Sequence, residues 1–324
     1  RFELLSQGTS IVIDESRPRR KKILKSTGAG EIEIFTSGST GEPKNIRHSV
    51  ENLFQCMEKI KHIYDFDIDS IHYNNLPFYY LGGISNHFIC SIVSGGSTKL
   101  LPQSKIDNLF FTIEEFCKGS SNVFWMPTNS YKSIYEYVNE KRGYWSEKEN
   151  KCLVGMESVS KEFKVSFKKL FGLNLCESYG LSESNLLTAA RAGDLGIGAC
   201  LPGVKLEIRN PDTENVGEVF AKTNHMCLNP SNMHDGWYAT GDLGIREQKG
   251  NISICGRKKW IIKKNGQLIN PLSIERRITN KLGTDKVFVV GITDSIRGEA
   301  IVFLTTLSKS EWNNIKDKVL AVLA

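Results

Sequence analysis

A loop rich in glycine and hydroxyl residues, closed by a lysine, is the first segment whose residue types could do chemistry. It spans residues 36–44 and follows an alternating polar–apolar segment at 31–35 that is typical of a strand. Glycines let backbone N–H groups close around an anion, hydroxyl groups add donors, and the lysine adds positive charge. The residues expected to contact phosphate are Thr36, Ser37, Gly38, Ser39, Thr40, Gly41 and Lys44.

The common nucleotide-binding patterns do not describe this loop. A Walker A loop needs a glycine five residues after Gly38, where this chain has Pro43. Gly28 and Gly30 do not begin a dinucleotide fingerprint, because Glu33 stands at the third glycine position and the segment precedes a strand. Taken alone, the loop is compatible either with phosphate binding or with a plain linker.

Three later segments follow in a fixed order and add further functional groups. Residues 179–183 (Tyr-Gly-Leu-Ser-Glu) place an aromatic ring, a hydroxyl and a carboxylate after an apolar segment. Residues 236–244 hold Asp242 between glycines, and residues 256–263 begin with Gly-Arg-Lys-Lys. Together with the loop at 36–44, these motifs resemble those of the AMP-forming adenylating superfamily, which includes acyl- and aryl-CoA synthetases. The resemblance extends from residue 31 to about 305, and residues 75–85 look most like the compact o-succinylbenzoate–CoA ligase type.

The resemblance implies roles around the adenine and the ribose of ATP. Tyr179 would stack on adenine, which would lie between it and the loop at 155–157. Glu177 or Ser178 would contact the exocyclic amine, and Asp242 would accept hydrogen bonds from the ribose hydroxyls, with Arg257 near the same sugar. The implied nucleotide-binding set outside the loop is Gly155, Met156, Glu157, Glu177, Ser178, Tyr179, Gly180, Ser182, Asp242 and Arg257.

The resemblance also assigns the residues closest to the reaction. Lys44 and the loop would hold the β- and γ-phosphates, Ser182 would contact the α-phosphate, and Glu183 would bind Mg²⁺, which prefers oxygen ligands. The carboxylic acid would lie against residues 79–87, Trp125, Met126 and the stretch after Glu183. Its expected contacts are Tyr80, Gly82, Gly83, His87 and Trp125. Tyr80 stands where relatives often have histidine.

The reaction implied is activation of a carboxylic acid, of aryl or fatty type, as an acyl-adenylate with release of pyrophosphate. Transfer to the thiol of CoA would follow, or transfer to the phosphopantetheine of an acyl carrier protein. A non-catalytic protein that binds a nucleotide or an acyl-adenylate is the alternative of another class. Three features motivate it. The N-terminal subdomain is expected to be reduced, and Trp260 stands at the expected hinge, where an indole that prefers burial would restrain rotation. The catalytic lysine of the family is not found up to Ala324, and we expect it beyond that residue. A hydrolase is disfavoured, because residues 180–184 lack the final glycine of a nucleophile elbow.

Apolar periodicity predicts an α/β protein with a large first domain and a small α+β second domain. We expect residues 1–257 to form the adenylate-forming domain, with a reduced N-terminal subdomain, and 258–324 to form a partial lid domain after a hinge near Trp260. Helices are predicted at 50–63, at 161–171 with Gly172 as its stop signal, and at 271–282, and Ser308 or Ser310 should cap a last helix. Strands are predicted at 121–126, 173–176, 204–208, 218–222, 252–255, 287–292 and 300–305, with a hairpin at 260–269.

The composition bears on the partners and the location of the protein. The 324 residues carry 42 basic and 36 acidic side chains, a net charge of +6, which does not favour nucleic acid as a partner. The basic run at 17–22 reads as a solvated segment, and the lysines at 161–169 are expected to face water. No window contains 18 consecutive apolar residues, so no membrane span is expected. The eight cysteines form no C-x-x-C pair, which indicates reduced thiols and a cytoplasmic location.

Overall fold

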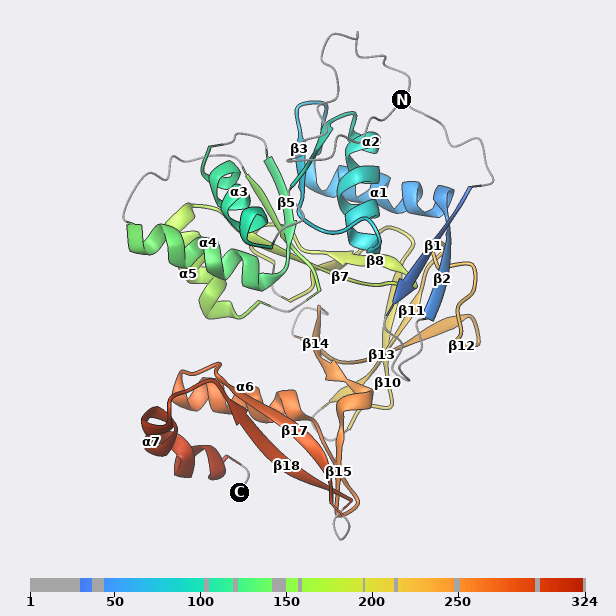
Figure 1. The fold of residues 1–324 in the computed structure, drawn as a ribbon. Helices are drawn as coiled ribbons and strands as arrows, with labels where there is room; N and C mark the ends of the chain where they lie inside the picture. Colours follow the sequence, from blue (N-terminus) through green and yellow to red (C-terminus); the bar gives the residue numbers. More distant parts are fainter. Residues whose placement is uncertain are drawn as a thin grey trace. The chain divides into compact units, whose positions relative to one another are not determined.

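Short apolar strands alternate with amphipathic helices along the first part of the chain and form a mixed sheet of seven strands (Figure 1). The computed structural model describes residues 30–36, 44–101, 105–118, 122–141, 150–156, 159–194, 196–212, 215–247, 251–294 and 298–322. The sheet has the order β4-β3-β5-β6-β7-β8-β9, parallel from β4 to β7 and antiparallel from β7 to β9. The bounds are β3 Ile71–Asn74, β4 Ser97–Leu100, β5 Asn122–Met126, β6 Lys151–Val154, β7 Leu175–Leu181, β8 Asn185–Ala189 and β9 Ala199–Cys200.

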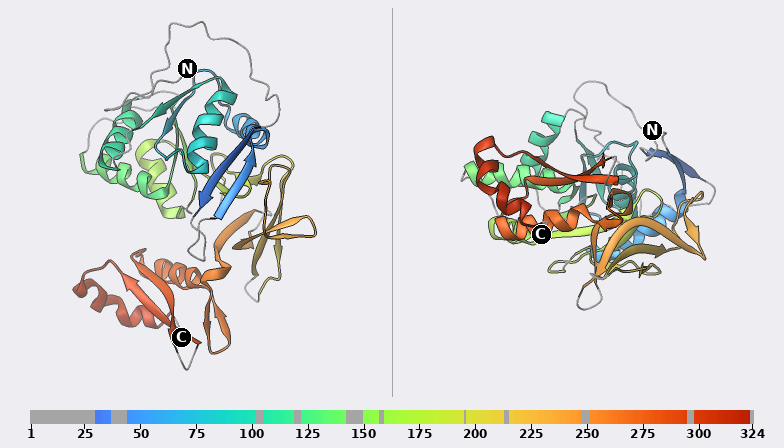
Figure 2. Two further views of the ribbon diagram at one scale, coloured as in Figure 1. Left: turned by 45° about the vertical axis from the view of Figure 1, so that its right-hand side comes forward. Right: turned by 90° about the horizontal axis from the view of Figure 1, so that it is seen from below.

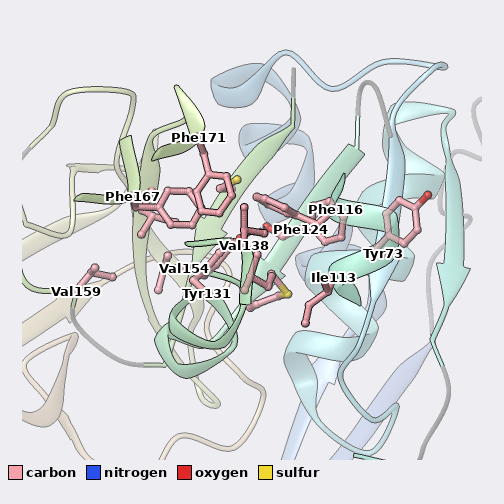
Figure 3. Close-up of a cluster of buried hydrophobic side chains, with 14 of the residues drawn as sticks. Tyr73, Ile113, Phe116, Phe124, Tyr131, Val138, Val154, Val159, Phe167 and Phe171 are labelled. Atoms are coloured by element: carbon pink, nitrogen blue, oxygen red, sulfur yellow. Dashed lines mark hydrogen bonds between the residues drawn. The ribbon is translucent and has the colours of Figure 1, made fainter. Parts of the chain in front are cut away.

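Helices cover both faces of this sheet. On one face, α3 (Lys105–Lys118), α4 (Thr128–Lys141) and α5 (Lys161–Phe171) bury an aromatic cluster against β3, β5, β6 and β7. Figure 3 shows the rings of Phe116, Phe167 and Phe171 together with Phe124 of β5 in this cluster. On the other face lie α1 (Val50–Tyr64), a π-helical segment η1 (Gly83–Ile89) and α2 (Cys90–Ser94).

The helix ends follow the local signals in the sequence. Helix α5 begins after Ser160, whose hydroxyl accepts a hydrogen bond from Phe163 N, and it ends at Gly172 in the left-handed conformation, as predicted. The expectation that the lysines of this helix face water is wrong for Lys164. Its Nζ lies 2.5 Å from Glu177 Oε1, and its side chain is 17% exposed. A buried carboxylate on β7 therefore draws this lysine inward.

By its contacts the chain divides into two units, residues Arg1–Leu206 with Ala221–Tyr238, and Glu207–Phe220 with Ala239–Ala324. The first unit also contains the hairpin of β1 (Glu31–Thr36) and β2 (Lys44–Ser49). A further sheet has the strand order β10-β11-β13-β12, and β14 pairs with β13. Its strands are β10 Lys205–Arg209, β11 Val216–Lys222, β12 Met233–His234, β13 Trp237–Arg246 and β14 Ile252–Arg257. The expected domain boundary after Arg257, with its hinge near Trp260, stays a prediction.

In the second unit, a four-stranded sheet of order β16-β15-β18-β17 carries α6 and α7 on one face (Figures 1 and 2). The expected hairpin is present as β15 and β16, although its first strand begins at Ile262 because 258–260 form a short 3-10 helix. The expectation that the Trp260 indole is buried is wrong, since 56% of this residue is exposed. The bounds are β15 Ile262–Lys264, β16 Gln267–Ile269, α6 Pro271–Leu282, β17 Val287–Asp294, β18 Gly298–Thr305 and α7 Lys309–Leu320.

Ser308, rather than Ser310, caps α7, because its hydroxyl accepts from Glu311 N while the Glu311 carboxylate accepts from Ser308 N. Among the helices that the structure describes, none is both long enough and apolar enough to cross a membrane. The basic run at 17–22 lies outside the described residues.

Candidate functional site

The hairpin of β1 and β2 carries the loop that the sequence assigns to phosphate binding. Thr36 and Lys44 are partners across this hairpin. The loop residues between them that were expected to bind phosphate lie outside the described residues; these are Ser37, Gly38, Ser39, Thr40 and Gly41. Lys44 Nζ donates a hydrogen bond of 2.6 Å to Glu183 Oε1. The structure therefore joins two residues, 139 positions apart, that the resemblance assigns to phosphate and to Mg²⁺.

The turn between β7 and β8 presents Ser182 and Glu183. A bulge between Tyr179 and Gly180 shifts the register of the two strands just before this turn. Only glycine fits at position 180, because a Cβ atom there would lie 2.2 Å from the carbonyl oxygen of Asn185. The close approach of the two backbones explains the glycine that follows Tyr179.

Contacts from two distant segments hold this turn in place. The buried His48 of β2 lies with Nε2 2.6 Å from the carbonyl oxygen of Ser182, and burial lowers the pKa of this histidine. The carbonyl oxygen of Glu183 accepts from the backbone N–H of Cys227. Asn229 accepts from Arg47 N and donates to the carbonyl of Asn45, so residues 227–229 also hold the hairpin. The sequence pattern gives no signal for these residues, since their contacts are with segments far away along the chain.

Glu177 and Ser178, the two candidates for the adenine amine, point to opposite faces of β7. Glu177 Oε1 pairs with Lys164, and its Oε2 accepts from Val159 N. Ser178 Oγ donates to the carbonyl oxygen of Val154 and lines a pocket on the other face. Because Glu177 is committed to the aromatic side of the sheet, Ser178 is the better placed of the two. Glu157 lies outside the described residues.

The pocket lies where β5, β6 and β7 end, and its empty volume is about 550 Å³, part of it open to solvent. Of the expected acid contacts, Tyr80, Gly82 and Trp125 line it, and of the expected nucleotide contacts, Gly155, Met156, Ser178, Gly180 and Ser182 do so. The remaining lining residues are Leu76, Leu81, Asn86, Leu181, Asn185 and Leu186. Burial raises the pKa of the Tyr80 phenol, which therefore stays protonated at neutral pH.

Three expected contact residues have other surroundings. His87 is fully buried in η1, and its Nε2 lies 3.2 Å from the carbonyl oxygen of Trp125, so it contacts the backbone of a pocket residue. Burial lowers the pKa of His87 to about 4, and the ring is neutral. A Cβ on Gly83 would lie 2.4 Å from the carbonyl oxygen of Pro77, which makes this glycine a close-packing residue. Tyr179 is 8% exposed and is not among the lining residues.

Asp242 and Arg257 form a pair within the second unit. They are register partners on β13 and β14, and Arg257 Nε lies 2.8 Å from Asp242 Oδ1. Asp242 is 3% exposed, and its backbone N–H donates to Thr240 Oγ1. The predicted partner of the ribose thus already has a charged neighbour, which orients the carboxylate.

The described residues fit a magnesium ion held mainly by phosphate. They contain no group of three or more His, Cys, Asp or Glu side chains able to hold a metal. Glu183 is a single, mostly buried carboxylate at the turn. Mg²⁺ bound to a nucleotide commonly takes one or two carboxylates and completes its shell with phosphate and water oxygens. A lone Glu183 is therefore sufficient for this kind of site.

Comparison with known proteins defines the class. The family model described as AMP-binding enzyme matches residues 32–228, so this chain belongs to that family, as its motifs predicted. It is 27% identical over 296 residues to a long-chain-fatty-acid–CoA ligase of Bacillus subtilis, covering 85% of this chain and 52% of that protein. It is 23% identical over 299 residues to a malonate–CoA ligase of Arabidopsis thaliana, covering 83% and 49%.

The fold is also that of solved members. ATP-bound MatB from Rhodopseudomonas palustris matches with a TM-score of 0.73 and 19% identity, covering 88% of this chain and 61% of that one. This agreement confirms the expected fold class, a large α/β part with a β-rich portion and a small α+β part. The chain spans about half the length of the curated relatives named above.

Proposed function

We propose that this protein activates a carboxylic acid with ATP as an acyl-adenylate and then transfers the acyl group to the thiol of CoA. The observation that carries the proposal is the junction of Lys44 with Glu183, next to Ser182 at a pocket that Tyr80 and Trp125 also line. A cation, a carboxylate able to hold Mg²⁺ and a pocket thus converge on one turn. The relatives named above are CoA ligases, which favours CoA over a carrier protein as the acceptor.

In the first step, a carboxylate oxygen attacks the α-phosphorus and the bond to the β-phosphate bridging oxygen breaks. Pyrophosphate leaves with both electrons of that bond. Lys44 would neutralise the departing phosphates, and Ser182 would donate to an α-phosphate oxygen; positioning and charge neutralisation of this kind dominate phosphoryl-type transfer. Mg²⁺ supplies further charge neutralisation when bound, and Glu183 is the residue that would hold it.

In the second step, a thiol sulfur attacks the acyl carbon and AMP leaves with the oxygen that came from the acid. The thiol proton passes to solvent. The residues assigned to this proposal on the first unit are Lys44, Ser178, Ser182 and Glu183, with Thr36 at the base of the loop. Asp242 remains proposed as the acceptor for ribose hydroxyls, and Arg257 as the residue that orients it.

The test is pyrophosphate release by the complete protein with ATP, Mg²⁺ and a panel of acids, followed by thioester formation with CoA. Replacing the metal-binding carboxylate, Glu183→Gln, should lower pyrophosphate release by roughly 100-fold or more, because a neutral amide holds Mg²⁺ poorly. Glu31→Gln is the matched control. Glu31 belongs to an exposed pair with Arg47 on the same hairpin, and its loss should leave the rate unchanged.

The competing class makes a different prediction for the same protein. A non-catalytic binding protein would bind ATP in calorimetry and release no pyrophosphate with any acid. Unchanged pyrophosphate release by Glu183→Gln would remove this residue from the mechanism, and the Lys44 contact would then be structural only.

A further inference from the structure

The indole of Trp125 has a buried N–H group without a hydrogen-bond acceptor. Trp125 is 1% exposed, and no acceptor within the part of the chain that the structure describes lies in reach of its Nε1 atom. An indole nitrogen can only donate, so it cannot be satisfied by a change of tautomer or by a rotation. Unpaired buried donors are rare in folded proteins, and an unpaired one calls for an explanation.

The unpaired N–H lies among residues that line the pocket of the candidate site. A Cβ atom built on Gly155 would lie 3.3 Å from Trp125 Nε1 and 3.7 Å from Ser178 Oγ. Gly155, Ser178 and Trp125 all line this pocket. With no side chain at Gly155, the nitrogen edge of the indole lies directly beside this glycine and near a serine hydroxyl that already donates to Val154.

Residues of α1 and η1 contact the indole ring and the backbone of Trp125. The ring of Tyr64, on α1, meets it edge-on with centroids 6.4 Å apart. His87 Nε2 contacts the carbonyl oxygen of Trp125, which fixes the strand at this residue. Trp125 is thus a pocket-lining residue whose ring and backbone are both held by the elements on this face of the sheet.

The charges around the pocket limit which substrate groups can accept a hydrogen bond from the Trp125 N–H. None of the described residues that line the pocket is a lysine, an arginine or a histidine. A second carboxylate or a sulfonate on the substrate would lose its hydration here without gaining a cation, which is costly. A neutral oxygen, in contrast, needs only the single hydrogen bond that the indole can supply.

We propose that Trp125 determines substrate specificity, and that the acid carries a neutral oxygen acceptor, such as a carbonyl, hydroxyl or ether, which accepts from Trp125 Nε1. This inference rests on the proposed function and names the substrate class for it. It sets this protein apart from the two relatives named above, whose names specify a long alkyl chain and a second carboxylate.

The test compares matched acids with the complete protein: hexanoate against 5-oxohexanoate, and 4-ethylbenzoate against 4-methoxybenzoate. We expect kcat/KM for pyrophosphate release to favour the oxygen-bearing member of at least one pair on the order of tenfold or more, because the alternative leaves a buried donor unpaired. Trp125→Phe keeps an aromatic ring and removes the N–H. It should abolish that preference by lowering kcat/KM for the oxygen-bearing acid alone. Trp312→Phe, on α7, is the matched control and should keep the preference.

The outcomes separate the two proposals. Pyrophosphate release with equal kcat/KM for both members of every pair, or an equal loss for both in Trp125→Phe, overturns the role of Trp125 and leaves the proposed function standing. Absence of pyrophosphate release with every acid overturns the proposed function. In that case, calorimetry with the same pairs of acids tests Trp125: tighter binding of the oxygen-bearing member, lost in Trp125→Phe, supports its role, and equal binding overturns it. If Trp125→Phe does not fold, the comparison of pairs with the unaltered protein is decisive by itself.

Discussion

The two faces of the seven-stranded sheet are built from alternate residues of the same strands, and they differ in chemistry. Tyr73 and Phe124 point to the face covered by α3, α4 and α5, where their rings stack with centroids 4.9 Å apart. Their neighbours His72 and Trp125 point to the face covered by α1, where the buried ring nitrogens of both side chains lack partners among the described residues.

This difference shows how one sheet can separate stability from function. The aromatic face contains close ring contacts, for example between Phe116 and Phe171, whose ring centroids lie 5.4 Å apart. On the same face, Lys164 and Glu177 form a salt bridge. The opposite face keeps small residues and unpaired polar atoms close to the pocket. Dispersion and area burial stabilise the first face, whereas the second carries the pocket to which we assign the proposed function.

The largest effect that would test this contrast is loss of a ring on the aromatic face. Phe124→Ala should lower the free energy of unfolding by about 3–5 kcal/mol, because it deletes a fully buried ring between Tyr73 and Phe116. Urea denaturation measures this change. Trp125→Phe, one residue further along the strand, should cost much less and alter acid preference instead. A Phe124→Ala protein with unchanged stability and altered acid preference would contradict the division between the faces.

A smaller effect is expected at the bulge that connects the sheet to the site. Gly180→Ala places a Cβ 2.2 Å from the backbone oxygen of Asn185, so the two strands must separate. We expect a loss of stability of roughly 2–3 kcal/mol and at least a tenfold drop in pyrophosphate release, since the Ser182–Glu183 turn moves with the bulge.

Gly172→Ala provides the control for the bulge. This glycine ends α5 with φ 69°, and a Cβ there would meet no atom within 4 Å. The change should cost about 1 kcal/mol through the left-handed conformation and leave the rate unchanged. Equal losses of activity in both variants would show that Gly180 acts through stability alone.

Local patterns in the sequence were sufficient for most of the elements. The alternation at 31–35, the apolar spacing of α5 and the Asn265-Gly266 turn each depend on neighbours within a few residues, and each element is present. The same reasoning failed for Lys164, because the amphipathic pattern of a helix contains no information about the buried carboxylate of Glu177 on β7. It also failed for Trp260, which lies in a short 3-10 helix and is exposed.

The candidate site depended more on the resemblance than on the pattern. No spacing rule links Lys44 with Glu183, because their contact crosses two separate elements. Nor could the sequence indicate that His87 would contact the backbone behind Trp125 rather than line the pocket. The unpaired indole N–H is a statement about missing neighbours, which only a three-dimensional arrangement provides.

The smallest change in stability at neutral pH is expected for substitution of His72. This substitution is also the most direct test of the face covered by α1. Burial, with smaller contributions from His87 and Lys151, lowers the pKa of His72 to about 3, whereas an unfolded histidine has a pKa near 6.5. Between these values the unfolded chain binds a proton that the folded chain excludes, so stability falls as the pH drops from 6.5 and levels off near 3. His72→Phe should therefore change stability by less than about 1 kcal/mol at pH 7.

At pH 5 the same variant should retain about 2 kcal/mol that the unaltered protein has lost, since 1.5 pH units below 6.5 correspond to about 1.4 kcal/mol each. Urea denaturation at pH 7, 6 and 5 measures the slope. His62→Gln, which replaces an exposed histidine, is the control. His87 and His225, whose pKa values burial lowers to about 4, would still contribute, so the slope should become shallower without vanishing. An identical slope in His72→Phe would mean that the ring on this face is satisfied in solution, and the contrast between the two faces would then rest on Trp125 alone.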